Sequence, residues 1–426
     1  MKNRRILFIS PRQCWPTLSG AKLREYHFLQ ALAKEAQVTY VYFSENGENA
    51  RIQDRLPFCE EVVEVPRPKT YGIWNVVRGA VGRWPLSVLN YTSGAMAAAL
   101  AALKGSYDLV HLESIHVTRY RGLLARSPTI PNRFVYSWHN IESELMRRYA
   151  AAASSRARSL YAKQTACKLE RIEKEILRTA FGHVVCSERE REHLLWIAPR
   201  ARIVTVENGV NVSYFEKSGD ERAESRRRIV FVGKMDYYPN IEAAKHFVAR
   251  IWPMVTRRLP GAMLTIAGSD PVKAVRALNE VAGVNVTGTV PDLRPYYRDA
   301  LAAIVPLRDG GGTRLKILEA MAAGVPVIST KMGAEGLDLE PGRDILMAQA
   351  DEPTEWVAHL KWLAEAPEER AKIVARGMHL VKTRYDWNVV GDVLLKTYDK
   401  WLSSAGEPVD PPNAQNALAR AAEVST

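Results

Sequence analysis

Cysteine is scarce in this sequence, and the few cysteines are not spaced for a known kind of site. The 426 residues include four cysteines, at positions 14, 59, 167 and 186, and no two of them form a Cys-x-x-Cys pair. This scatter excludes a zinc ribbon and a disulfide framework, and it fits a reducing compartment. We therefore expect a cytoplasmic protein.

Long apolar runs are also missing. A helix that crosses a bilayer needs about 20 apolar residues, and the longest run of small apolar residues, 95–103, is much shorter. The apolar run 6–9 behind the basic start is too short for a signal peptide and predicts a buried first strand. We therefore expect no membrane-spanning segment.

Acidic residues are under-represented in the first half of the chain. Residues 1–205 contain 31 Lys and Arg against 18 Asp and Glu, whereas residues 206–426 contain 28 against 29. A basic half of this kind predicts an acidic partner such as an anionic lipid, a lipid-linked phosphate or nucleic acid.

Short apolar runs alternate with helical patterns along the chain. Most of these runs lack strict polar alternation, which is typical of strands buried on both faces of a parallel sheet. Each half therefore predicts a doubly wound α/β unit. The candidate strands are residues 6–10, 38–43, 61–65, 109–112, 134–138, 183–186, 203–206, 229–232, 263–267, 284–286, 303–305, 326–329 and 345–347.

The domain boundaries follow from composition. Residues 207–210 (Glu-Asn-Gly-Val) and the polar stretch 216–228 indicate a linker. We expect a first domain over 1–205, a second over 206–386, a last helix over 387–402 that packs back towards the first domain, and a disordered tail over 403–426 that is rich in proline and polar residues.

A glycine-rich segment follows the predicted strand 303–305. Glycines occupy 310–312, Thr313 is a good N-cap, and Arg314 and Lys316 follow. Glycines let the backbone approach a ligand, and the free N–H groups at a helix start attract an anion. This pattern favours a phosphate site at the start of a helix.

Lys316 and Glu319 lie three residues apart and share a helix face. Lys316 is placed to contact a phosphate, and Glu319 to accept hydrogen bonds from a ribose diol. The alternative is an exposed ion pair worth about 0.2–0.5 kcal/mol. The adjacent glycine run favours a nucleotide diphosphate.

Residues 319–327 (Glu-Ala-Met-Ala-Ala-Gly-Val-Pro-Val) resemble the signature of the retaining glycosyltransferases of the GT-B fold, family 4 or group 1. This family includes bacterial sucrose and glycogen synthases. The resemblance implies two Rossmann-like domains that face a central cleft, and a ribose-binding role for Glu319. The family has a carboxylate eight residues earlier, where this chain has Gly311; Asp309 is the nearest substitute.

Other segments resemble the same family. Residues 231–240 resemble the first donor-domain loop, with Gly233 and Lys234 beside the phosphates, and residues 265–269, 288–292 and 208–211 resemble later loops of that domain. Residues 16–24 resemble the glycine loop that closes over the donor. The predicted donor-binding residues are Gly20, Gly233, Lys234, Gly268, Gly311, Gly312, Thr313, Leu315 and Glu319.

The reaction centre is predicted around residues 137–142 (Ser-Trp-His-Asn-Ile-Glu), which directly follow a buried strand. Ligands bind at the carboxyl ends of such strands. In the family a His at this point lies beside the donor sugar, so the resemblance assigns His139 to positioning that sugar. Asn140, Glu142 and Arg24 are acceptor-side candidates, and Glu113 is a weaker one. A structural His that caps a strand end is the alternative.

No pair of carboxylates suggests a glycosidase-like double displacement. The resemblance implies a same-face mechanism in which the leaving diphosphate accepts the acceptor's proton. Arg314 and Lys316 would stabilise the developing charge, with Lys234 assisting. His139, Arg314 and Lys316 are therefore the predicted catalytic residues. The chain has no Asp-x-Asp motif, so neither a metal nor a cofactor is expected.

The acceptor is predicted only as a saccharide or a lipid-linked molecule. Residues 71–85 mix aromatic, apolar and basic residues, and residues 143–180 hold nine Lys and Arg against four Glu. Both patterns favour peripheral contact with an anionic membrane surface. An ordinary solvated helix with i,i+4 ion pairs is the alternative.

Several other functions remain as alternatives. A dehydrogenase is disfavoured because no Gly-x-Gly-x-x-Gly follows the first strand. A nucleic-acid-binding protein is disfavoured because no known motif appears. An epimerase of the same fold, and a non-catalytic nucleotide-sugar-binding protein, remain open. The sequence thus predicts a retaining glycosyltransferase of polysaccharide or glycoconjugate biosynthesis that uses a nucleotide-diphosphate sugar.

Overall fold

A computed structural model describes residues 1–17, 19–44, 52–68, 72–153, 155–216, 227–298, 300–310 and 314–404. The chain forms two compact units. Unit 1 comprises Met1–Val206 and Gly391–Thr426, and unit 2 comprises Glu207–Val390. The linker stretch 217–226, the tail from 405 and the glycine-run residues Gly311, Gly312 and Thr313 lie outside the described residues.

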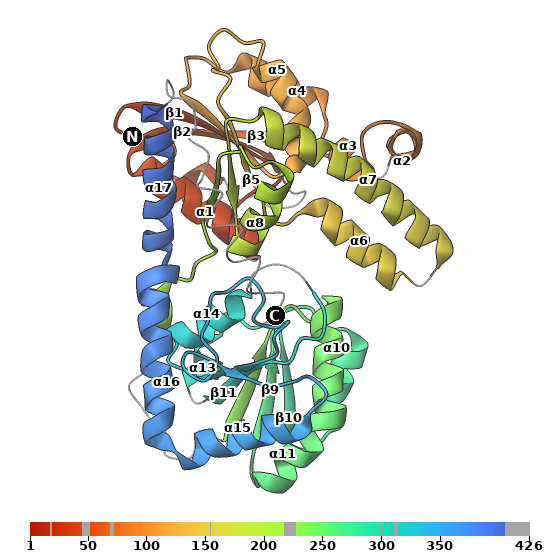
Figure 1. The fold of residues 1–426 in the computed structure, drawn as a ribbon, viewed down its shortest axis with the longest axis vertical. Coiled ribbons are helices and arrows are strands. Elements are labelled where there is room, and N and C mark those ends of the chain that lie inside the picture. Colours follow the sequence, from red (N-terminus) through yellow and green to blue (C-terminus); the bar gives the residue numbers. More distant parts are fainter. Residues whose placement is uncertain are drawn as a thin grey trace. The chain divides into compact units, whose positions relative to one another are not determined.

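Unit 1 is built on a seven-stranded parallel sheet in the order β3-β2-β1-β4-β5-β6-β7, with helices around it (Figure 1). Its strands are β1 (Arg4–Ser10), β2 (Ala36–Ser44), β3 (Glu61–Pro66), β4 (Leu109–Glu113), β5 (Phe134–Ser137), β6 (Gly182–Val185) and β7 (Ile203–Thr205). Its helices are α1 (Gly20–Ala33), η1 (Ile52–Arg55), α2 (Ile73–Val81), α3 (Leu86–Leu89), α4 (Gly94–Ala102), η2 (Ile115–Tyr120), α5 (Arg121–Leu124), α6 (Glu142–Ala152), α7 (Arg156–Thr179) and α8 (Glu188–Ile197). Most of α17 (Trp387–Ser403) also belongs to this unit.

Unit 2 is built on a six-stranded parallel sheet in the order β10-β9-β8-β11-β12-β13. Its strands are β8 (Arg228–Val232), β9 (Met263–Ala267), β10 (Val284–Gly288), β11 (Ala300–Val305), β12 (Val327–Ser329) and β13 (Leu346–Met347). Its helices are α9 (Val212–Glu216), α10 (Tyr238–His246), η3 (Phe247–Ile251), α11 (Trp252–Arg258), α12 (Lys273–Arg276), η4 (Ala277–Glu280), α13 (Arg294–Arg298), α14 (Leu315–Ala322), α15 (Pro353–Glu365), α16 (Pro367–Leu380) and η5 (Val381–Tyr385).

The two sheets have the same strand order. In each sheet the third, second, first, fourth, fifth and sixth strands along the unit are neighbours in that sequence, and unit 1 adds β7 at the end. Their central strands are buried on both faces: residues 6–10 of β1 and all of β11 are buried. This explains the continuous apolar runs in the sequence. The prediction of two doubly wound α/β domains is confirmed.

Two details differ from the sequence prediction. The strand expected over 303–305 begins earlier, at Ala300. The N-cap of α14 is Arg314, which caps without a side-chain hydrogen bond, and not Thr313. Among the described residues, no helix has the length and apolar content needed to cross a bilayer.

Candidate functional site

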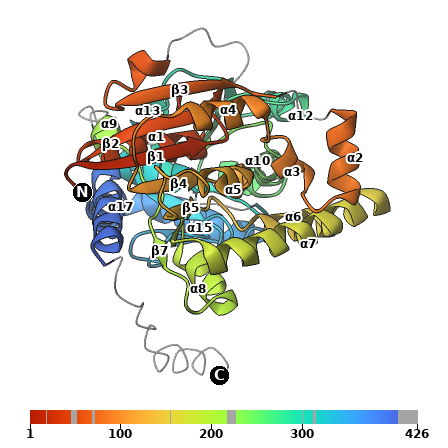
Figure 2. The same ribbon diagram turned by 90° about the horizontal axis from the view of Figure 1, so that it is seen from above.

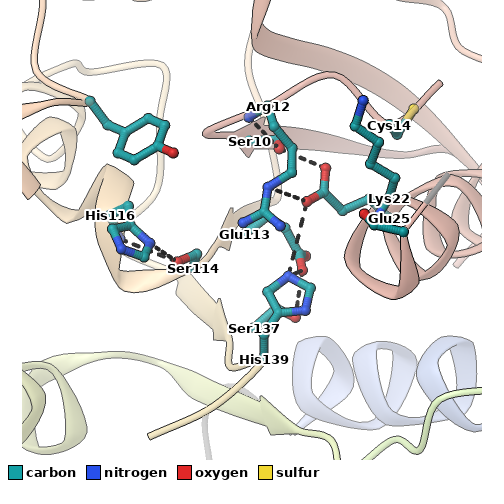
Figure 3. A network of polar contacts seen from close by, with 12 residues as sticks. Ser10, Arg12, Cys14, Lys22, Glu25, Glu113, Ser114, His116, Ser137 and His139 are labelled. Atoms are coloured by element: carbon teal, nitrogen blue, oxygen red, sulfur yellow. Dashed lines mark hydrogen bonds and ion pairs between the residues drawn. The ribbon is translucent and has the colours of Figure 1, made fainter. Parts of the chain in front are cut away.

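A buried polar network lies at the carboxyl ends of β1, β4 and β5, which are neighbours in the sheet of unit 1 (Figure 3). The three strands end at the same edge of the sheet, because the strand register pairs Glu113 with Ser137 and Ile9 with Leu112. These ends carry polar side chains in place of the apolar ones that fill the strand interiors. Ligands of open α/β sheets bind at this edge.

Glu113 is the centre of this network. Its side chain is fully buried, and its two carboxylate oxygens contact three groups. Oε2 lies 2.6 Å from His111 Nε2, and Oε1 lies 2.6 Å from His139 Nε2. The hydroxyl of Ser137 donates to Oε1 at 3.1 Å. Burial acts to raise the pKa of Glu113, but attraction to the protonated form of His139 and the hydrogen bonds from both imidazoles hold that pKa well below its usual range.

His111 is fixed from both sides. It lies two residues before Glu113 on β4, so both side chains point to the same face of the sheet. Its Nδ1 lies 2.6 Å from the hydroxyl of Tyr398 on α17, and its ring stacks on Phe8 at 4.1 Å. Helix α17 therefore supports the network through one buried tyrosine.

His139 is partly open to solvent, with 14% of its side chain exposed, whereas Glu113 and His111 are fully buried. Burial lowers its pKa, although the adjacent Glu113 carboxylate acts in the opposite direction. A neutral imidazole whose Nε2 faces an ionised carboxylate carries its proton on that nitrogen. Its Nδ1 is then an acceptor for a hydroxyl group.

A second carboxylate, Glu25 on α1, lies in the same network. Its Oε1 is 4.0 Å from His139 Nε2 and 3.4 Å from Arg12 Nε, and Ser10 donates to its Oε2 at 2.7 Å. Burial raises the pKa of Glu25 to about 8; Arg12 opposes the shift, and the charge of Glu113 reinforces it.

Glu25, Glu113 and His139 are also the described residues whose ligand atoms converge, all within 4.8 Å of one another, as a metal site would require. The residues around them fit a metal poorly. Arg12 already supplies positive charge beside Glu25, and His139 Nε2 is directed at Glu113 Oε1. A metal at this point would need the imidazole to lose its present contact and would lie beside a guanidinium.

The other predicted residues of unit 1 lie around this network. Asn140 and Glu142 line a small pocket with Ser114 and His139, and burial followed by the charge of Glu173 raises the pKa of Glu142 to about 7. Arg24 is fully buried, with its guanidinium 4.2 Å from the centre of the Phe28 ring. Their acceptor-side roles stay predictions.

Gly20 begins α1, directly after the N-cap Ser19, whose side chain accepts from the N–H of Lys22. The glycine is exposed at this turn. Its predicted contact with the donor also stays a prediction.

The sequence analysis missed Glu25, Arg12, Ser10 and Tyr398. A signal for Glu25 was present, because positions 25, 28, 29 and 32 form the buried stripe of α1 and the first of them is a carboxylate. No comparable signal marks Tyr398, which is separated from His111 by 287 residues.

Unit 2 contains the second set of predicted residues, around the start of α14. Lys316 Nζ donates to Asn240 Oδ1 at 2.9 Å and lies 4.8 Å from the centre of the Phe231 ring. A Cβ atom on Gly233 would approach Nζ to 2.7 Å. A glycine at this position therefore leaves the ammonium group room beside the β8 turn.

At Gly268, both the backbone conformation and a close backbone contact require glycine. Its φ is +152°, and a Cβ at this position would lie 1.7 Å from the carbonyl oxygen of Gly233. The turns that follow β8 and β9 are thus packed backbone against backbone. The N–H of Gly233 donates to Ala267 and that of Met235 to Ser269, which ties the two turns together.

Lys316 and Glu319 have opposite pKa shifts of the kind found in functional sites. Burial, and then the charge of Arg314, lowers the pKa of Lys316 to about 7, whereas Glu319 opposes the shift. Burial raises the pKa of Glu319, and Lys316 opposes that shift. Perturbed pKa values of this size accompany ligand sites more often than surface pairs do.

The remaining predicted residues of unit 2 surround these two. Arg314 is buried and Leu315 is half-buried at the first turn of α14. Lys234 is exposed, 3.1 Å from Asp236 and 4.0 Å from Asp270. The carboxylate of Asp309 accepts from the N–H of Gly310, which has a φ of +124°.

Two family models match successive parts of the chain. The model described as "Glycosyl transferase 4-like domain" matches residues 23–209, and the one described as "Glycosyl transferases group 1" matches residues 226–366. The chain belongs to the group 1 glycosyltransferases. The two models together include Glu25, Glu113 and His139 of unit 1 and Lys316 and Glu319 of unit 2.

Curated relatives match this chain at low sequence identity. A D-inositol 3-phosphate glycosyltransferase of Saccharomonospora viridis is 25% identical over 354 residues, which is 76% of this chain and 77% of that protein. An uncharacterised 44.6 kDa protein from the cps region of Klebsiella pneumoniae is 28% identical over 128 residues, 28% of this chain and 33% of that protein. The alignments with D-inositol 3-phosphate glycosyltransferases of Thermobispora bispora and Rhodococcus erythropolis span about half of those proteins, 53% and 52%.

Solved structures establish the fold. Sucrose-phosphate synthase from Thermosynechococcus elongatus superimposes with a TM-score of 0.69 at 17% identity, covering 94% of this chain and all of that one. HepE from Anabaena in complex with UDP-glucose gives 0.61 at 14% identity, covering 93% and 99%. The fold of this group 1 glycosyltransferase is therefore GT-B.

Proposed function

We propose that this chain transfers a sugar, with retention of anomeric configuration, from a nucleotide-diphosphate donor to a saccharide or lipid-linked acceptor. The observation that carries the proposal is the arrangement of Lys316, Glu319 and Gly233 at the start of α14. Family membership and the UDP-glucose complex of HepE support a nucleotide-sugar donor.

Unit 2 would bind the donor. An ammonium group partly stripped of water and adjacent to a glycine turn gains most when a diphosphate restores its counter-charge. Arg314 adds a second positive charge at the same helix end. Glu319, one turn further along α14, would accept hydrogen bonds from the ribose diol.

These cations would also serve the reaction itself. Negative charge develops on the diphosphate as the sugar leaves, and donors already in place stabilise this charge without reorganisation. Lys316 and Arg314 are the groups that supply this stabilisation, and Lys234 assists. The departing diphosphate would take the proton of the acceptor hydroxyl, as in a same-face transfer.

Unit 1 would orient the reacting sugar. The Glu113 carboxylate fixes the tautomer of His139, so the imidazole offers Nδ1 as a hydrogen-bond acceptor with one orientation. Because the pKa of His139 is lowered, the ring stays neutral and repels no cationic character that develops on the sugar ring.

A panel of UDP-, GDP- and ADP-glucose tests this proposal. We expect one donor to raise the thermal unfolding temperature and to be slowly hydrolysed, and both effects to be lost in Lys316→Ala and Glu319→Ala. Glu242 and Lys245 form an exposed pair at the same i,i+3 spacing on α10, and their alanine variants serve as the matched control. NMR of the first-formed product would show whether the anomeric configuration is retained.

A non-catalytic nucleotide-sugar-binding protein is the second candidate, favoured by Gly311 at the position where the family has a carboxylate. It predicts a donor that binds in a Lys316-dependent manner and is neither hydrolysed nor transferred, even with membrane extract as the acceptor source. If no nucleotide sugar binds, or if the Lys316 variant binds like wild type, the donor-site assignment is wrong.

A further inference from the structure

Two stretches of unit 1 contain no acidic residue at all. Residues 65–107 and 145–169 hold eleven Lys and Arg and no Asp or Glu. The first stretch includes α2, and the second includes the end of α6 and the first half of α7. Positive charge from two separate segments produces the strongest local electrostatic potential where the segments meet in space.

The two stretches are in contact. Gln164 on α7 donates to the carbonyl oxygen of Ala80 on α2 at 2.8 Å, and Lys168 Nζ donates to those of Gly79 and Ala80, each at 2.7 Å. α6 and α7 pack against each other as a helical hairpin, and α2 lies beside it in both views (Figures 1 and 2). Helices α2 and α7, one from each acid-free segment, therefore meet.

These two helices expose large apolar side chains. Val81 is 84% exposed and Leu160 is 70% exposed, and Val77 and Tyr161 are also exposed. Leu160 lies one helical turn before Gln164, so it shares the face of α7 that reaches α2. Val77 and Val81 are likewise one turn apart on α2. Apolar side chains grouped in this way indicate an interaction surface.

Basic side chains accompany these apolar ones, and their charge is not neutralised. Arg78, Arg156 and Lys163 are exposed and form no ion pair among the described residues. The nearest carboxylates on α7 are already paired, because Glu170 contacts Lys174 and Arg147, and Glu175 contacts Arg83. We define the α2–α7 face as these three basic residues together with Val77, Val81, Leu160 and Tyr161.

We propose that the α2–α7 face docks on a lipid bilayer that contains anionic phospholipids. The aliphatic and tyrosine side chains would enter the headgroup region, while Arg78, Arg156 and Lys163 contact lipid phosphates. A bilayer matches both properties of the face, whereas a nucleic acid would use the charge and leave the apolar side chains in water. The inference does not depend on the proposed sugar transfer, because docking needs no donor.

Sedimentation with vesicles tests this inference on the full chain. We expect binding to vesicles of phosphatidylcholine mixed with phosphatidylglycerol, much weaker binding to pure phosphatidylcholine, and loss of binding at high salt. The double variant Arg156→Glu/Lys163→Glu should lower the partition coefficient about 30-fold. Val81→Ser/Leu160→Ser should lower it about tenfold or more.

Matched controls lie outside the face. Arg257→Glu/Arg258→Glu makes the same charge change on the exposed end of α11, and Trp196→Ser removes a side chain on α8 that is 82% exposed. Both should bind vesicles like wild type. Unchanged thermal unfolding temperatures and donor binding would show that all variants fold. No binding to anionic vesicles, equal binding to both vesicle types, or equal losses in the controls would overturn the proposal.

Discussion

The two sets of candidate residues differ in how their polar groups are satisfied. In unit 1, the Glu113 carboxylate contacts His111 and His139, and His111 also contacts Tyr398. In unit 2, Lys316 has an amide oxygen and an aromatic ring as neighbours, and its pKa is lowered to about 7. The contacts in unit 1 fix the tautomer of His139. In unit 2, by contrast, Lys316 can take up a proton when an anion binds beside it.

This contrast predicts a division of labour between orienting and binding. A buried carboxylate that already contacts two imidazoles gains little from a ligand and serves to hold one imidazole in place. A partly desolvated lysine gains most of its stabilisation from the ligand itself. Substitutions in unit 1 should therefore lower turnover at unchanged donor affinity, whereas substitutions in unit 2 should weaken donor affinity as well as turnover.

Glu113→Gln should have the largest effect. The variant removes the charge that fixes His139 and places an amide between two imidazoles, so we expect donor turnover to fall about 100-fold or more. Initial rates at saturating donor measure this effect. Glu190→Gln is the matched control, because Glu190 is another buried carboxylate of unit 1 that accepts from a backbone N–H, that of Cys186. Equal rates in the two variants would refute the role of Glu113.

Gly268→Ala should show that the unit 2 site depends on close backbone approach. The added methyl group would meet the Gly233 carbonyl oxygen, so we expect the free energy of unfolding to fall by about 2–3 kcal/mol. Chemical denaturation measures the change. Gly288 also has a positive φ, +73°, but an added Cβ there would meet no atom within 4 Å, so Gly288→Ala should cost about 1 kcal/mol. If Gly268→Ala lowered the free energy of unfolding no more than Gly288→Ala does, the turns after β8 and β9 would not depend on close backbone packing.

Donor affinity should depend on pH through Lys316. Above pH 7 the free lysine is neutral, because burial lowers its pKa to about 7, so binding a diphosphate requires uptake of a proton. We expect the donor Kd to rise up to about tenfold per pH unit above pH 7. Calorimetric titrations across this range should show the slope in wild type and its disappearance in Lys316→Arg. A slope that survives in Lys316→Arg would assign the proton to another group.

Tyr398→Phe should have the smallest effect. Loss of the hydroxyl leaves His111 Nδ1 without its 2.6 Å partner, but Phe8 and Glu113 still hold the ring. We expect turnover to fall about threefold to tenfold with donor Kd unchanged. A change in Kd without a change in turnover would contradict an orienting role for the network.

Sequence patterns predicted the fold well because the fold depends on local signals. Buried strands appear as short apolar runs, and each candidate strand corresponds to one in the structure within a few residues. The Lys316–Glu319 pair was predictable for the same reason, since both lie on one short helix. Two doubly wound α/β units followed from these elements, whereas the GT-B architecture was implied by the resemblance of residues 319–327 to the family signature.

The unit 1 network was only partly predictable because its contacts are distant in sequence. Glu113 ends β4 and His139 directly follows the neighbouring β5, and both were found, but Tyr398 comes from α17 and Arg12 from a loop. Glu25 was hidden because a carboxylate in an apolar stripe is normally expected at the surface. Which buried side chains contact one another depends on tertiary packing, and the spacing of apolar residues in the sequence does not predict it.

The most direct test of the central claim is calorimetric titration of the stabilising donor into Glu113→Gln and Lys316→Ala in parallel, with donor hydrolysis followed on the same samples. We expect Glu113→Gln to bind the donor like wild type and to hydrolyse it hardly at all, and Lys316→Ala to bind at least about tenfold more weakly. Normal donor affinity in Lys316→Ala, or loss of donor binding in Glu113→Gln, would contradict the assignment of donor binding to α14 and of orientation to the Glu113 network.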